Sequence, residues 1–156
     1  MTPFEAPPQH VLDAVIAIAA AYLFVLPLAV ERHRKGASHV GLRTLPLVSV
    51  AACAYLLLSR FLVERGVFSP DGQARSLRSL MTGIGFIGGG AILKRDSTHG
   101  VGGITTAASV WTTGAIGAAL AYGYYSLAAV LALSSVIVIE SVLRRRPAAH
   151  HQAQRP

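Results

Sequence analysis

MTGIGFIGGGAIL (81–93) and GITTAASVWTTGAIGAALAY (103–122) are two apolar stretches separated by a short charged turn. The first carries five glycines, and a glycine inside a helix costs about 0.5–1 kcal/mol relative to alanine. In a lipid bilayer, however, the backbone must be hydrogen-bonded within the chain, and small residues let neighbouring helices approach closely. The two stretches therefore predict two adjacent membrane helices, with a loop or re-entrant segment as the alternative for the first.

The glycines of the first stretch divide between two sides of a helix. At about 100° per residue, Gly83 and Gly90 fall on one side, while Gly85, Gly88 and Gly89 fall on another. A helix with glycines on two sides is expected to pack closely against two neighbouring helices. We therefore expect this glycine-rich helix to be the central one.

The composition is that of a membrane protein with a single domain. Hydrophobic residues make up 53% of the chain and charged residues 13%, compared with about 25% charged residues in soluble proteins. The net charge of +7 comes from basic residues that flank apolar runs, where such residues determine orientation. No basic stripe is interleaved with aromatic residues, so we expect no nucleic-acid partner. The lone Cys53 lies in an apolar run and predicts a small buried side chain.

The distribution of apolar runs predicts an all-α polytopic protein with about five transmembrane helices. A polar segment (1–10) precedes a membrane domain (11–143), and a basic tail (144–156) that we expect to be disordered follows it. Pro46 is expected at the start of the second helix. The apolar part of the third is short, so that helix either starts near Arg75 or is shielded by its neighbours. The predicted helices cover 11–30, 45–63, 75–93, 104–121 and 126–143.

The positive charges predict the orientation of these helices. If the N-terminus lies outside, the outer segments hold only four of the 14 lysines and arginines, namely Arg60, Arg65, Arg75 and Arg78. The positive-inside rule then places the N-terminus outside and the C-terminus in the cytoplasm.

Hydroxyl groups give the fourth helix a polar stripe. Thr105, Ser109 and Thr112 share one face, and they either line a polar crevice or donate hydrogen bonds back to their own helix, which we favour. Small residues share another face that suits packing against the third helix. These are Ala107, Gly114, Ala118 and Ala121.

Ionisable residues are absent from the middle of the predicted spans. Glu31 beside Arg32, with Arg43 across the first cytoplasmic loop, forms either a clamp between helices one and two or ordinary orientation charges. We find no nucleophile–base pair, nucleotide-binding loop or metal-ligand spacing. We therefore expect no enzyme activity and no cofactor or metal site.

Three blocks of sequence resemble one known family. ERHRKGASHVGLRT (31–44), GIGFIGGGAILKR (83–95) and GGITTAASVWTTGAIG (102–117) are similar, in order and spacing, to the signatures of the MgtC/SapB family of bacterial inner-membrane proteins. The resemblance covers roughly residues 11–143. Family members commonly have glycines where this chain has Val25 and Ala29, and many carry a soluble C-terminal domain, whose activity we expect this chain to lack.

The resemblance implies a multi-pass inner-membrane protein associated with growth under magnesium limitation and, in some members, with virulence. It favours a regulator that acts through another membrane protein or through its own copies; the alternatives are a small ion or solute conduit and a structural membrane module. The residues that it marks as motif or structural positions are Glu31, Arg32, Gly41, Leu42, Arg43, Thr44, Arg75, Gly83, Gly85, Phe86, Gly88, Gly90, Gly103, Thr105, Thr106, Ala107, Ala108, Trp111 and Gly117.

Overall fold

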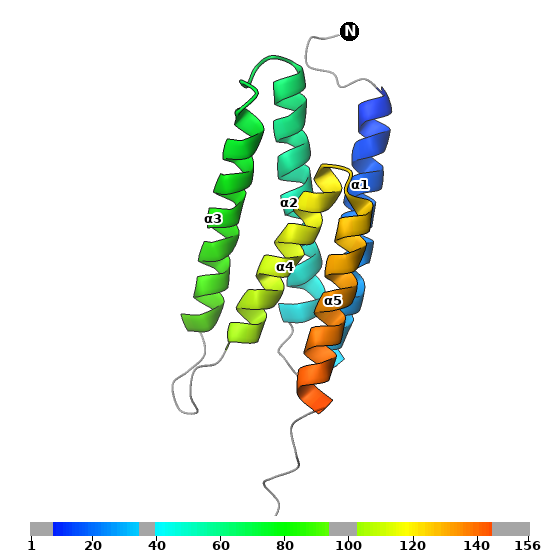
Figure 1. Ribbon diagram of the computed structural model, residues 1–156, viewed down its shortest axis with the longest axis vertical. Coiled ribbons are helices and arrows are strands. Elements are labelled where there is room, and N and C mark those ends of the chain that lie inside the picture. Colours follow the sequence, from blue (N-terminus) through cyan, green and yellow to red (C-terminus); the bar gives the residue numbers. More distant parts are fainter. Residues whose placement is uncertain (1–7, 35–39, 94–102, 145–156) are drawn as a thin grey trace, which may run out of the picture.

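The computed structural model describes residues 8–34, 40–93 and 103–144, and these form an antiparallel bundle of five helices (Figure 1). The described residues contain no strand, so the predicted all-α fold is confirmed. The N-terminal segment 1–7 and the tail from 145 onward lie outside the described residues. The helices are α1 (Pro8–Arg34), α2 (Val40–Glu64), α3 (Gly72–Leu93), α4 (Ile104–Ala121) and α5 (Tyr125–Arg144).

Three of these helices are long and apolar enough to cross a membrane. They cover His10–Arg34, Gly41–Glu64 and Ile104–Ala121, and a shorter apolar helix covers Tyr125–Ser141. α3 begins before Arg75, as a span of sufficient length requires, but its first half also carries charged residues. Five complete crossings and their orientation therefore stay predictions.

The first two helices extend beyond the predicted spans. The four residues ERHR (31–34) form the last turn of α1, and GLRT (41–44) forms the first turns of α2, instead of a loop. A helix can continue past its apolar run because its last side chains reach water, and basic residues favour the C-terminal end of the helix dipole. Pro46 consequently lies inside α2 rather than at its start, which corrects that prediction.

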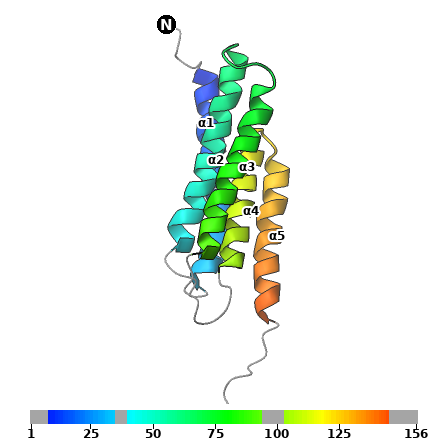
Figure 2. The same cartoon turned by 90° about the vertical axis from the view of Figure 1, so that its left-hand side faces the viewer.

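α4, and not the glycine-rich α3, is the central helix. α4 contacts all four other helices, whereas α3 contacts only α2 and α4. Figure 1 shows α4 in the middle and α3 at the edge, and Figure 2 shows α3 beside α4, with α1 and α2 on one side and α5 on the other. The prediction of a central α3 is wrong. Glycines allow another helix to pack closely against a face, but they do not require that a helix packs there.

The burial pattern explains the position of α4. Its buried residues cover most of its circumference and include Ala107, Val110, Thr113, Ile116 and Gly117. One stripe of the helix, at Ile104, Ala108, Trp111 and Ala115, is exposed. Among residues 72–92 of α3, only Gly72, Ile84 and Gly88 are buried. Because α4 carries small residues over this broad buried surface, several neighbouring helices can approach it closely.

The α4–α5 connection is a tight turn at the predicted aromatic cluster. Gly123 has a φ of 78°, a left-handed conformation that favours glycine. Its backbone N–H donates to Leu120 O at 3.0 Å, and that of Tyr124 donates to Ala119 O at 2.9 Å. The turn satisfies carbonyls at the end of α4 and directs α5 back along the bundle.

Candidate functional site

The backbones of α2 and α4 meet at Gly117. A Cβ added to Gly117 would overlap the carbonyl oxygen of Ser49 and lie 3.1 Å from the Cβ of Ala52. The side chain of Ser49 is fully buried at this crossing, and its hydroxyl has no hydrogen-bond partner among the described residues. Only glycine fits at position 117 without moving one of the two helices.

The small face of α4 packs against α3, as the sequence predicts. The end of the Ile84 side chain occupies the space that a Cβ on Gly114 would need. Gly88 follows one turn later in α3. Its ideal Cβ position lies 3.6 Å from the carbonyl oxygen of Ala107 and 3.7 Å from the Cβ of Ala107. Gly114 is therefore as much a contact residue as the motif glycines, although the resemblance did not mark it.

Trp111 covers the other glycines of this interface. Its indole ring lies 3.8 Å from the ideal Cβ position of Gly85 and 3.5 Å from that of Gly88. The side chain is 44% exposed, so one side of the ring packs on α3 while the other remains accessible. Trp111 therefore anchors the packing of α4 on α3.

The opposite side of α3 is open, and we call Gly83, Phe86, Ile87 and Gly90 the open face. Apart from the helix's own backbone, no atom of the described residues lies within 4 Å of the ideal Cβ position of Gly83 or Gly90, nor of the neighbouring Gly89. Phe86 is 86% exposed and Ile87 about half exposed. The glycines of α3 thus contribute to one helix interface, the one with α4. On the open face, where a second interface is expected, no helix of the described chain packs.

The open face borders an apolar groove between α2 and α3. The groove has a volume of about 490 Å³, and Gly83 and Ile87 line it together with Thr44, Leu47 and Tyr55 of α2. Leu47 and Tyr55 are more than half exposed. The groove and the open face therefore form one continuous apolar surface.

Residues of the first and third sequence blocks meet at one end of the bundle, which we call the motif junction (Arg32, Gly41, Gly103 and Thr106). Arg32 at the end of α1 donates from Nη2 to the hydroxyl of Thr106 in α4 at 2.5 Å. Gly41 of α2 packs on the same turn of α1, with its ideal Cβ position 3.2 Å from the Cβ of Arg32. This contact brings the starts of α2 and α4 together around the end of α1.

Gly103 completes the motif junction at the N-terminal end of α4. Its φ is 91°, and a Cβ there would overlap the carbonyl oxygen of Ala91 in α3. Both the backbone conformation and the contact require glycine. The end of α3 and the start of α4 are therefore held in direct backbone contact.

The hydrogen bond that the structure shows at the motif junction links α1 to α4. Arg43 and Leu42 are exposed, and the described residues show no ion pair between Glu31 and Arg43. The clamp between α1 and α2 therefore stays a prediction. At the other end of the bundle, Arg75 donates to the hydroxyl of Ser69 at 2.6 Å in the turn before α3.

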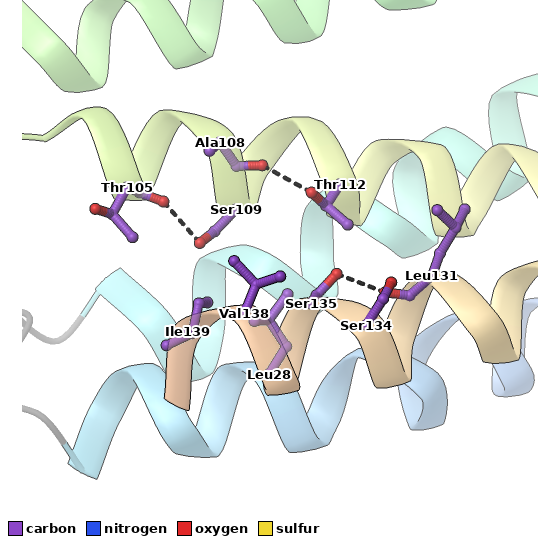
Figure 3. Close-up of a pocket in the computed structure, with 10 residues that line it drawn as sticks. All are labelled: Leu28, Thr105, Ala108, Ser109, Thr112, Leu131, Ser134, Ser135, Val138 and Ile139. Carbon is purple, nitrogen blue, oxygen red and sulfur yellow. Dashed lines mark hydrogen bonds between the residues drawn. The ribbon is translucent and has the colours of Figure 1, made fainter. Parts of the chain in front are cut away.

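Hydroxyl groups of α4 and α5 face each other across a crevice of about 310 Å³ (Figure 3). Thr105, Ser109 and Thr112 of α4 lie opposite Ser134 and Ser135 of α5. The remaining lining is apolar and consists of Leu28, Ala108, Leu131, Val138 and Ile139.

Four of the five hydroxyl groups in this crevice, all except that of Thr105, donate to their own helices. Ser109 donates to Thr105 O at 2.8 Å, and Thr112 donates to Ala108 O at 3.0 Å. Ser135 donates to Leu131 O at 2.5 Å. The prediction of back-bonding is confirmed for these α4 residues, and the crevice of the alternative interpretation is present as well.

Back-bonding limits what the crevice can bind. Because the protons of these four hydroxyl groups point to helix carbonyls, the four groups offer only oxygen lone pairs to a ligand. No carboxylate lines the crevice, and divalent cations usually bind through carboxylates. In the described ranges, no group of three or more His, Cys, Asp or Glu residues could hold a metal ion.

Residues 17–146 match the model of the MgtC family. Among curated proteins, the chain is 31% identical over 132 residues to YhiD of Escherichia coli (strain K12), whose name links it to magnesium transport. It is also 31% identical over 134 residues to the protein MgtC of Salmonella typhimurium (strain LT2), and 32% identical over 135 residues to an uncharacterized protein of Synechocystis.

These alignments cover most of this chain but only part of each relative. They include 82–86% of this chain, 60% of YhiD and 53% of the other two proteins. The chain therefore spans a little over half the length of the relatives that it matches. No solved structure matches it significantly.

Proposed function

The chain belongs to the MgtC family, and we propose that it is a regulator or accessory factor in magnesium homeostasis that acts by binding another membrane protein. In this proposal it is a multi-pass protein of the bacterial inner membrane, with the N-terminus outside and the C-terminus in the cytoplasm. It has no catalytic role and affects adaptation to magnesium limitation through its partner.

The observation that carries this proposal is the open face of α3. In a membrane, helices associate through close packing of small residues, because lipid tails are as apolar as the side chains they would replace. Gly83 and Gly90 lie seven residues apart on one side of α3 and have open space above them. The adjoining groove between α2 and α3 offers an apolar surface to the same incoming helix.

The orientation in this proposal is tested by reporter fusions. A reporter fused after Gly72, in the turn that begins α3, should read outside the cytoplasm, and one fused after Arg146 should read cytoplasmic. A cytoplasmic reading at Gly72 would contradict the orientation.

The regulatory role is tested by crosslinking in native membranes, followed by purification of the chain. We expect another membrane protein to be recovered, in an amount that differs between magnesium-replete and magnesium-starved cells. The double substitution Gly83→Leu and Gly90→Leu should abolish this recovery, because it fills the open face without touching the bundle. Val130→Leu enlarges an exposed residue of α5 and serves as the matched control.

Recovery of this chain alone would indicate that the surface joins two copies, and would contradict a role through another protein. Recovery of the same partner with the double variant would show that the open face is not the binding surface.

The crevice between α4 and α5 favours a second candidate function, a conduit for a small solute. Five hydroxyl-bearing side chains line it, three from α4 and two from α5. Without a carboxylate it is poorly suited to a dehydrated magnesium ion. We expect purified protein in liposomes to show no magnesium flux; a saturable, protein-dependent flux would favour the conduit over the regulator.

A further inference from the structure

A groove of about 360 Å³ lies between the beginning of α1 and the end of α2, at the opposite end of the bundle from the motif junction. Apolar side chains form most of its lining, among them Val15, Ile18, Leu57, Leu58 and Phe61. Four ionisable side chains complete the lining: His10, Asp13, Arg60 and Glu64. One end of the groove is thus charged and the rest apolar.

The charged end lies at the depth of lipid headgroups. His10 begins one of the apolar helices that are long enough to span a membrane, and Glu64 ends the next. Both helix ends therefore reach the same membrane–water interface. The apolar lining at Ile18 and Leu57 lies one to two helical turns deeper, beside the acyl chains. The groove is therefore charged at the depth of the headgroups and apolar at the depth of the acyl chains, which matches the polarity of a phospholipid.

The ion pairs at the charged end leave one donor and one acceptor available. Glu64 Oε1 accepts from Arg60 Nε at 2.9 Å, and its Oε2 lies 3.7 Å from His10 Nδ1. Arg60 uses only its Nε in this pair, so its terminal nitrogens can still donate to an anion. Asp13 forms no ion pair within the described part of the chain, so its carboxylate can accept from a cation.

The signs of these groups favour a zwitterionic headgroup over an anionic one. Two carboxylates, those of Asp13 and Glu64, line the groove beside one guanidinium, that of Arg60, so the lining offers no excess of positive charge to attract an anionic headgroup. A phosphate beside Arg60 requires a cationic group beside Asp13 to balance it. A primary ammonium can donate hydrogen bonds to that carboxylate, whereas a trimethylated ammonium cannot.

We propose that the groove between α1 and α2 binds a membrane phospholipid with a primary-ammonium headgroup, such as phosphatidylethanolamine. Arg60 binds the phosphate and Asp13 binds the ammonium. The upper part of an acyl chain packs on Val15, Ile18 and Leu57. This site is independent of the proposed regulatory role and of the open face of α3.

The test uses the full chain in detergent with equal amounts of phosphatidylethanolamine, phosphatidylcholine and phosphatidylglycerol that carry identical acyl chains. Native mass spectrometry counts the lipid that the protein retains. We expect phosphatidylethanolamine to be retained about fivefold more than phosphatidylcholine, as for one hydrogen-bonded ion pair at an exposed site. Phosphatidylglycerol should be retained least.

Single substitutions assign the two contacts. Asp13→Asn should remove the preference for phosphatidylethanolamine over phosphatidylcholine, and Arg60→Gln should reduce the retention of both, because both contain the phosphate. Asp71→Asn removes a carboxylate at the same end of the bundle but outside the groove, and should change nothing. Equal retention of the three lipids, or a preference that survives Asp13→Asn, would overturn the proposal. Circular dichroism confirms that each variant is folded.

Discussion

α3 and α4 are both rich in small residues, yet the bundle uses them differently. In α4 the small residues are in contact with neighbours: Gly117 with the backbone of α2 and Gly114 with Ile84 of α3. Of the five glycines between positions 83 and 90 of α3, only Gly85 and Gly88 are covered, by Trp111 and Ala107 of α4, while Gly83 and Gly90 face open space. The difference teaches that the effect of a glycine depends on what occupies the space above it, and that identical substitutions in the two helices should have opposite consequences.

The largest effect is expected for Gly117→Ala in α4. The added methyl group overlaps the carbonyl oxygen of Ser49, and neither backbone can move without separating α2 from α4. We expect a loss of about 3 kcal/mol in the free energy of unfolding, at the upper end of overpacking costs. Unfolding in mixed micelles, followed by the fluorescence of Trp111, the only tryptophan, measures it.

The next effect is expected for Gly103→Ala at the start of α4. Alanine at a φ of 91° is strained, and its Cβ meets the carbonyl oxygen of Ala91, so we expect a loss of about 2 kcal/mol. Gly123→Ala is the matched control, because Gly123 has a φ of 78° but no atom within 4 Å of its ideal Cβ position. Equal losses in the same unfolding assay would show that the contact with α3 contributes nothing.

A smaller effect is expected for Thr106→Val, which keeps the shape of the side chain but removes the acceptor for Arg32. A partly buried hydrogen bond to a charged group contributes about 1.5–3 kcal/mol, and we expect the lower end of that range. Thr82→Val in α3 is the control, because the exposed Thr82 donates only to Arg78 O of its own helix. Thermal melting in detergent should place Thr82→Val within about 0.5 kcal/mol of the original chain. A larger loss for Thr82→Val than for Thr106→Val would contradict the role of the motif junction.

The smallest effect, of opposite sign, is expected for Gly83→Ala in α3. Because no neighbouring atom in the part of the chain that the structure describes lies within 4 Å of its ideal Cβ position, the methyl group causes no clash there, and alanine is the better helix former. We expect a gain of about 0.5 kcal/mol in the free energy of unfolding. A loss comparable to that of Gly117→Ala would mean that Gly83 is packed in the single chain, and would remove the contrast between the two helices.

Several features of this protein follow from the sequence because they depend on local geometry. The positions of apolar runs gave five helices, and α4 has the predicted bounds, Ile104–Ala121. The spacing of Ser109 and Thr112 from carbonyls one turn earlier is set within a single helix, so back-bonding could be predicted. The turn at Tyr122–Gly123 also follows from local sequence.

The sequence did not reveal where the polar motif segments end, since a helix can continue past its apolar residues. The blocks around Arg32 and Gly41 therefore appeared to be a loop, although both lie in helices. The sequence also did not predict the hydrogen bond from Arg32 to Thr106, which lies 74 residues away. Such a contact depends on how three helices converge, which no periodicity encodes.

By itself, the sequence determined the class of the protein, the number of helices and which residues share a face, because these follow from hydropathy and from the period of a helix. Only the tertiary structure decided which face finds a neighbour. It placed α4 at the centre and left Gly83 and Gly90 of α3 open. The physical reason is that small residues give both helices faces that could accept a neighbour, and which face is covered depends on how all five helices pack together.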